Sequence, residues 1–119
     1  MDDLLPKELR EELEEKYKEF KNEDRVVEYL SAIFKALGDP TRLKIIYLLS
    51  QHSLCVTDIS EILNMNQSSI SHQLSILRNL GLVRINKNGK FSEYYLDDHH
   101  VVTLFKQGYE HASHKKKGL

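Results

Sequence analysis

Residues 67–96 read QSSISHQLSILRNLGLVRINKNGKFSEYYL, and the rest of the chain can be interpreted outward from them. The first part predicts a helix from Ser68 to Leu80, because Ile70, Leu74 and Leu77 recur at helical spacing. The second part predicts a β-hairpin, since two β-rich runs, residues 82–85 and 91–96, flank a loop that contains Asn-Gly. A helix followed directly by a hairpin indicates a winged helix-turn-helix, and residues 64–66 supply the preceding turn.

The exposed side of the predicted helix is polar and uncharged as far as Ser75. Short hydroxyl and amide side chains let a helix lie close to base edges, whereas a merely solvated helix usually carries Glu and Lys. Two short helices joined by a turn are by themselves more often a packed hairpin than a DNA reader. The basic hairpin that follows favours DNA, because its lysines can reach phosphates. The candidate DNA-binding residues are Gln67, Ser68, Ser69, Ser71, His72, Gln73, Lys87 and Lys90.

Four further helices are expected upstream of this region. Apolar residues recur at helical spacing in residues 6–21, 26–37, 41–51 and 56–63. In the third of these helices, we expect Leu43, Ile46 and Leu49 to face the core. The Asp39-Pro40 pair before it is typical of a helix N-cap and first turn.

Charge is distributed unevenly along the 119 residues, whose formal net charge is only −1. Residues 1–24 carry ten acidic and five basic side chains, while residues 66–96 carry four basic side chains and one acidic side chain. The basic part coincides with the predicted DNA-binding region, as phosphate neutralisation requires. No apolar run approaches the roughly twenty residues of a membrane span, and no secretory signal follows Met1, so we expect a cytoplasmic protein without a membrane partner.

Three stretches resemble the ArsR/SmtB family of metal-responsive transcriptional repressors. They are Ala36-Leu37-Gly38-Asp39-Pro40-Thr41-Arg42-Leu43, Leu54-Cys55-Val56-Thr57-Asp58-Ile59 and Gln67-Ser68-Ser69-Ile70-Ser71-His72-Gln73-Leu74. The resemblance extends from about Val26 to the C-terminal region. It implies a homodimer that represses a double-stranded operator and releases it when metal binds.

The last segment contains four of the six histidines and predicts an amphipathic helix from about Asp98 to Lys115. Its candidate metal ligands form two local pairs, Asp98 with His100 and His111 with His114. Eleven residues of helix separate His100 from His111 by about 16 Å, so one ion cannot bridge them. An antiparallel copy of the same helix would bring the first pair of one subunit to the second pair of the other. The resemblance implies the same ligand set, because the family's C-terminal-helix site has this spacing.

Three imidazoles and a carboxylate suit zinc, with cobalt and nickel as alternatives, and the ion is expected to act as an allosteric effector. Four protein ligands would close the zinc shell, and no nucleophile and base arrangement is recognisable elsewhere, so we expect a non-enzyme without a small-molecule substrate. Two other functions stay open: a winged-helix regulator with a purely structural metal, and a metal-binding protein that does not bind DNA. Cys55 is expected to be a small buried residue, because Thr57 stands where a second thiolate would be needed.

The expected architecture is a single, mainly α domain with a small β-hairpin (α+β), a winged helix-turn-helix that forms a homodimer. Its parts are N-terminal helices in residues 1–37, core helices with the helix-turn-helix in 38–80, a β-wing in 81–96, and a C-terminal helix for dimerisation and metal binding in 97–117.

Overall fold

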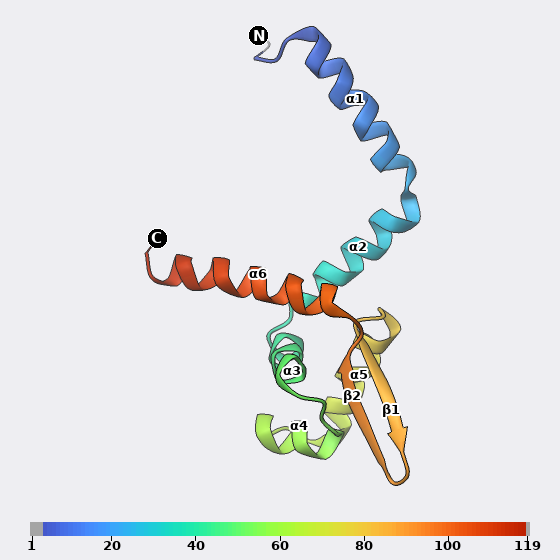
Figure 1. The fold of residues 1–119 in the computed structure, drawn as a ribbon, viewed down its shortest axis with the longest axis vertical. Coiled ribbons are helices and arrows are strands. Elements are labelled where there is room, and N and C mark those ends of the chain that lie inside the picture. The colour runs from blue at the N-terminus through green and yellow to red at the C-terminus, as the bar shows by residue number, and fades with distance from the viewer. Residues whose placement is uncertain (1–3, 119) are drawn as a thin grey trace. The chain divides into compact units, whose positions relative to one another are not determined.

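The computed structural model describes residues 4–118 and divides after Phe34 into two compact units. The first unit holds α1 (Lys7–Asn22) and most of α2 (Asp24–Leu37). The last turn of α2 belongs to the second unit. That unit also contains α3 (Pro40–Gln51), α4 (Val56–Leu63), α5 (Gln67–Asn79), β1 (Val83–Asn88), β2 (Phe91–Leu96) and α6 (His99–Lys116) (Figure 1).

Both helices of the first unit are amphipathic. In α1, Leu9, Leu13 and Tyr17 recur at helical spacing, yet their exposed fractions are 40%, 46% and 61%. In α2, Tyr29 and Phe34 are exposed to a similar extent. Within this unit the apolar faces of α1 and α2 therefore remain largely in contact with solvent.

The helix boundaries of the second unit follow from local capping. Asp39 caps α3 by accepting a hydrogen bond from the Arg42 backbone N–H at 3.0 Å, and Pro40 stands in its first turn. Asn66 caps α5 through a 2.7 Å bond from the Ser69 N–H. Between α4 and α5, Asn64 adopts a left-handed conformation with φ 53°, which allows the sharp turn of the helix-turn-helix. The predicted helices are confirmed, with ends shifted by at most two residues.

The core of the second unit lies among α3, α4 and α5. Its fully buried side chains are Ile45, Ile46, Ile59, Ile70, Leu74 and Leu77. The prediction for α5 is thus confirmed, but the prediction for α3 is partly wrong, because Leu43 is 38% exposed and Ile45 is buried instead. Neighbouring helices cover the side of α3 that bears Ile45 and leave Leu43 uncovered.

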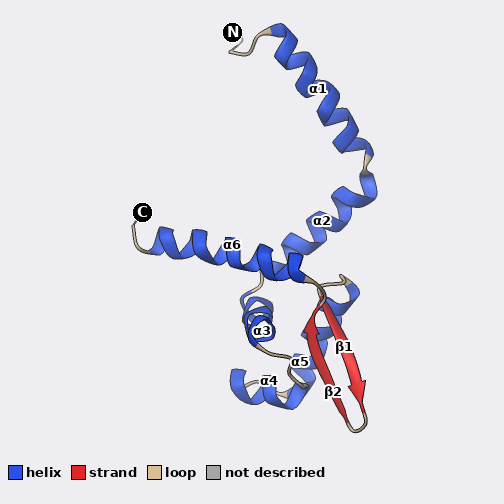
Figure 2. Cartoon of the chain, in the orientation of Figure 1, coloured by secondary structure: helices blue, strands red, loops and turns tan. Residues whose placement is uncertain are grey.

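The wing is a two-stranded antiparallel hairpin, which Figure 2 shows in red. Its register runs from Val83 opposite Leu96 to Asn88 opposite Phe91, so only Gly89 and Lys90 form the turn. Gly89 has φ +58°, and a glycine at the first central position is typical of a tight hairpin turn. Strand β1 therefore extends beyond the run of residues 82–85 that the sequence predicted, and the Asn-Gly pair still marks the position of the hairpin turn.

The segment before α4 also joins the wing. Leu54 forms an isolated antiparallel bridge with Tyr94, with backbone bonds of 3.1 and 2.7 Å in the two directions. This bridge fixes the entrance to the helix-turn-helix against β2. None of the helices in residues 4–118 is long and apolar enough to cross a lipid bilayer.

Candidate DNA-binding and metal-binding sites

The polar side of α5 is presented to solvent. Because Ile70, Leu74 and Leu77 occupy the core side, the opposite side carries Ser71 and His72, both of which are exposed. Gln67 and Ser68 are exposed at the start of the helix, and Ser69 is half-buried beside its N-cap. The Gln67 amide donates to the Thr57 hydroxyl at 3.3 Å, which links the start of α5 to α4.

Gln73 differs from the other candidate residues of α5. It is half-buried, and its amide oxygen accepts a hydrogen bond from Arg42 Nε at 2.9 Å. Its side chain is therefore turned toward α3. Whether it also contacts DNA stays a prediction.

The two wing lysines are both exposed. Lys87 lies on β1 opposite Ser92, and Lys90 lies in the turn, at the end of the hairpin remote from α6 (Figure 1). At its other end, the hairpin is held by an ion pair between Arg84 and Asp97. A basic tip on an anchored hairpin is suited to contacting a phosphate backbone.

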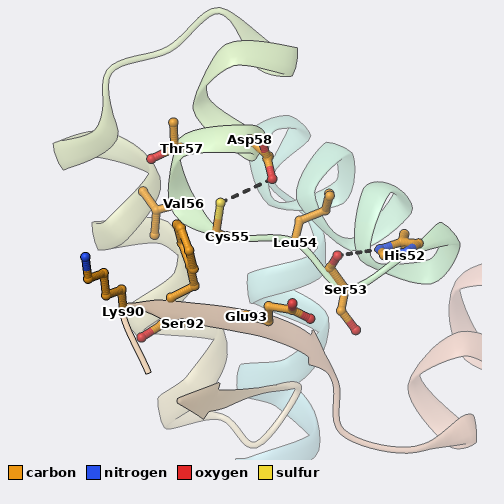
Figure 3. Close-up of a pocket in the computed structure, with 11 residues that line it drawn as sticks. His52, Ser53, Leu54, Cys55, Val56, Thr57, Asp58, Lys90, Ser92 and Glu93 are labelled. Carbon is orange, nitrogen blue, oxygen red and sulfur yellow. Dashed lines mark hydrogen bonds between the residues drawn. The ribbon is translucent and has the colours of Figure 1, made fainter. Parts of the chain in front are cut away.

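A pocket of about 620 Å³ lies between the wing and the start of α4. Figure 3 shows Lys90, Ser92 and Glu93 on one side and Cys55, Val56 and Thr57 on the other. Cys55 is half-buried, and its thiol donates to Asp58 Oδ2 at 3.2 Å. The prediction of a buried apolar cysteine is therefore wrong: the N-terminus of α4 opens onto this pocket, so Cys55 is not enclosed.

The first pair of predicted metal ligands is formed where α6 begins. Asp98 is the N-cap, and its Oδ1 accepts hydrogen bonds from the backbone N–H groups of His100 and Val101 at 2.8 and 3.3 Å. Its other oxygen, Oδ2, lies 3.4 Å from His100 Nδ1. Capping therefore holds the carboxylate beside the imidazole. The His99 ring lies against the His100 ring, with centroids 4.3 Å apart and ring planes tilted by 35°.

The local environment favours the ionised form of the Asp98 carboxyl. Desolvation raises the pKa of this carboxyl. Hydrogen bonds from the His100 side chain and from the backbone of His100 and Val101 lower it, and together they outweigh the desolvation, so the pKa lies below the ordinary aspartate value. The side chain is still 46% exposed. An ionised, accessible carboxylate oxygen beside an imidazole nitrogen is a suitable donor pair for a divalent cation.

The second pair lies near the end of α6. His111 and His114 are both exposed and are three residues apart, so they share one face of the helix. The rise of a helix places them about 16 Å from the first pair. Within residues 4–118 of one chain, no group of three or more His, Cys, Asp or Glu side chains is arranged to hold a metal ion. Each pair supplies at most half of a tetrahedral ligand set.

Comparison with known proteins places this fold among bacterial regulators. Residues 39–84 match the family described as bacterial regulatory protein, arsR family. The cadmium resistance transcriptional regulatory protein CadC homolog of Staphylococcus aureus is 42% identical over 83 residues, which are 69% of this chain and 69% of that protein. The chain belongs to the ArsR family. The HTH-type transcriptional regulator NmtR of Mycobacterium tuberculosis is 41% identical over 76% of this chain and 75% of NmtR.

Solved structures of similar proteins have the same fold. The homodimeric winged helix-turn-helix domain of a possible ArsR-family regulator from Mycobacterium bovis superposes with a TM-score of 0.78 at 26% identity, over 82% of this chain and 90% of that one. The solution structure of apo-NmtR gives a TM-score of 0.66 at 38% identity, over 76% of each chain. The prediction of an ArsR/SmtB-type winged helix-turn-helix is confirmed.

One residue with a role in this site was not found from the sequence. Arg42 lies in one of the stretches that resemble the family, but no contact was predicted for its side chain. In the structure its side chain is only 20% exposed and reaches α5. A basic side chain in the first turn of a helix, two residues after the N-terminal proline, is compatible with many contacts, so the sequence contained no specific signal.

Proposed function

We propose that this ArsR-family protein is a homodimeric, cytoplasmic repressor that binds double-stranded operator DNA and releases it on binding zinc. The observation that carries the proposal is the pairing of Asp98 Oδ2 with His100 Nδ1 at 3.4 Å, on the helix that directly follows the wing. The proposed metal half-site and the proposed DNA-contacting wing thus lie at opposite ends of one continuous segment. The relatives named for metal resistance or transcriptional control support this assignment.

Two groups of residues would contact different parts of the DNA. Gln67, Ser68, Ser69, Ser71 and His72 would approach base edges in the major groove, together with Gln73. Lys87 and Lys90 would contact phosphates, because a lysine side chain carries a compact charge that suits the backbone and reads no sequence. The exposed positions of Ser71, His72 and both lysines support this division.

Asp98, His100, His111 and His114 would hold the ion, with the first pair from one subunit and the second pair from its partner. Zinc would supply a tetrahedral link between the two subunits, and cobalt or nickel could occupy the same donors. The four side chains leave no coordination position for a substrate, which supports a regulatory protein rather than a metalloenzyme.

The dimer would be formed by the N-terminal helices and α6. Large apolar side chains on these helices are exposed in the single chain. They are Leu13 and Tyr17 on α1, Phe34 on α2, and Leu104 and Tyr109 on α6. Groups of large exposed apolar side chains commonly mark an interaction surface. The homodimeric state of the solved relative from Mycobacterium bovis supports a dimer.

Metal would weaken DNA binding only if the ligand geometry favours a dimer arrangement that fits the operator less well. The required coupling is about 1–3 kcal/mol, typical of allosteric proteins. Because each site takes ligands from both subunits, closing it constrains how the two subunits are oriented. That constraint would change the spacing of the two recognition helices, which must match successive turns of the groove.

The test is a fluorescence titration with the metal-free protein and a duplex selected from a random pool for tight binding. Zinc chloride should release the duplex from the parent and fail to release it from a His111→Ala variant. His52→Ala is the matched control, since it removes an exposed imidazole that lies outside α6 and outside the ligand set, and it should respond like the parent. Zinc that stabilises the fold without releasing DNA would indicate a structural metal. The absence of any salt-dependent binding to duplex DNA would indicate a metal-binding protein that does not bind DNA.

A further inference from the structure

The Arg42 guanidinium joins three segments of the second unit. Its Nε donates to Gln73 Oε1 on α5 at 2.9 Å, and its Nη1 donates to the Ala36 carbonyl in the last turn of α2 at 3.1 Å. Asp39 Oδ2 lies 4.0 Å from Nε and also accepts from the Arg42 backbone. The side chain of Arg42 is 20% exposed, so these bonds form largely out of water.

The chemistry of arginine fixes the orientation of the Gln73 amide. A guanidinium has five N–H donors and no acceptor, so only the amide oxygen of Gln73 can face it. The amide nitrogen must then point away from Arg42 and keeps both of its hydrogens. Within residues 4–118, no hydrogen bond from that nitrogen is found.

The contact with Ala36 has an independent cause. Carbonyls in the last turn of a helix lack partners inside the helix, and Arg42 satisfies one of them at the end of α2. The positive charge also lies at the negative end of the helix dipole. One planar guanidinium therefore contacts both the recognition helix and the end of α2.

We propose that Arg42 is a positioning residue for DNA recognition, which holds the Gln73 amide oxygen against α3 so that α5 presents only the Gln73 amide nitrogen, a donor, to DNA. The proposal rests on the proposed DNA-binding function. It assigns Gln73 a specific chemistry: a bidentate contact to adenine needs both the oxygen and the nitrogen of a glutamine directed at the base. Because the contact with Arg42 turns the amide oxygen toward α3, Gln73 instead donates to a base acceptor such as guanine O6 or N7.

The experiment measures how strongly each variant prefers the selected duplex over a random duplex of equal length, at fixed salt. Arg42→Lys keeps the charge but loses the fork of donors. It should lower the preference about tenfold, the loss expected for one charge-assisted hydrogen bond. Arg78→Lys is the matched control, because Arg78 is exposed on α5 and a lysine can replace it at a phosphate; its preference should stay within about twofold of the parent.

Two changes at Gln73 separate orientation from contact. Gln73→Met removes both polar groups and should lower the preference about tenfold, with no further loss when it is combined with Arg42→Lys. Gln73→Glu keeps an acceptor for Arg42 but has no donor, so it should retain parental hydrogen exchange in α5 and still lose preference for the selected duplex. Additive losses in the double variant, or parental preference in Gln73→Glu, would overturn the proposal.

Hydrogen exchange in the DNA-free protein keeps this test separate from the proposed function. Arg42→Lys should speed amide exchange in α5, and Arg78→Lys should not. If the parent prefers no duplex at all, the proposed function fails, while the exchange result still tests the Arg42 contact. Parental exchange in Arg42→Lys, with thermal melting confirming that the variant is folded, would show that Arg42 does not position the recognition helix.

Discussion

Asn66 allows a quantitative test of how the recognition helix begins. Its side-chain oxygen accepts the Ser69 N–H at 2.7 Å and satisfies one of the unpaired donors in the first turn of α5. Asn66→Ala removes this bond, and loss of such a cap destabilises a protein by about 1 kcal/mol. Asn66→Ser keeps an acceptor at the same position, so its free energy of unfolding should stay within about 0.5 kcal/mol of the parent.

The effect on DNA binding should follow a different order. Asn66→Asp keeps the cap and adds a negative charge that suits the helix dipole, so the free energy of unfolding should not fall. The same charge lies at the end of α5 that would approach phosphates, and it should weaken binding to selected and random duplexes alike. Asn66→Ser should bind both duplexes nearly as well as the parent.

Urea denaturation of the metal-free protein measures the stability order, and fluorescence titration with duplex DNA measures the binding order. Both should be done at one protein concentration, because a dimer's apparent stability depends on it. The expected stability order places the alanine variant lowest, and the expected binding order places the aspartate variant lowest. An alanine variant as stable as the parent would refute the capping argument, and an aspartate variant with parental affinity would refute the placement of this helix end near phosphates.

Three other outcomes are expected from the same structure. Asp98→Asn preserves a capping oxygen but loses the anionic ligand, so its zinc affinity should fall about tenfold or more. Competition with a chelating dye measures this affinity. Asp97→Asn makes an equal change of charge at the neighbouring residue and should leave the zinc affinity unchanged. Lys90→Gln should weaken binding to all duplexes and lower the slope of log affinity against log salt by about one; a loss confined to the selected duplex would contradict a phosphate contact. Tyr109→Asp, at a side chain that is 60% exposed in the single chain, should produce monomers in sedimentation at micromolar concentration, whereas Ile62→Asp, at a similarly exposed position on α4, should remain dimeric.

Local sequence signals were sufficient to predict the helices and strands and most of their boundaries. The spacing of Ile70, Leu74 and Leu77 predicted the buried side of α5, and all three are fully buried. Residues 64–66 were predicted as a turn, and the left-handed conformation of Asn64 confirms it; the structure adds that Asn66 caps α5. The positions of the candidate ligands along α6 also follow from the sequence, since helical geometry determines which residues three or eleven positions apart share a face; their role as ligands stays a prediction.

The sequence was less informative about which faces are covered. Periodicity identifies residues that share a side of a helix, but it does not say where a neighbouring element ends. Leu43 and Cys55 were both expected inside, and both are partly open to solvent because α3 and the start of α4 are not covered there.

The tertiary structure alone determined the contacts between distant residues. Arg42 and Gln73 are 31 positions apart, and Leu54 bridges to Tyr94 only because α5 and the hairpin fold back beside the segment before α4. Each side chain has several possible partners of the same chemistry along the chain. The sequence therefore determined the helices, the wing and the spacing of the candidate ligands, because these follow from residues close together in the chain. The orientation of Gln73 depends on packing between α3 and α5, so only the tertiary structure could decide it.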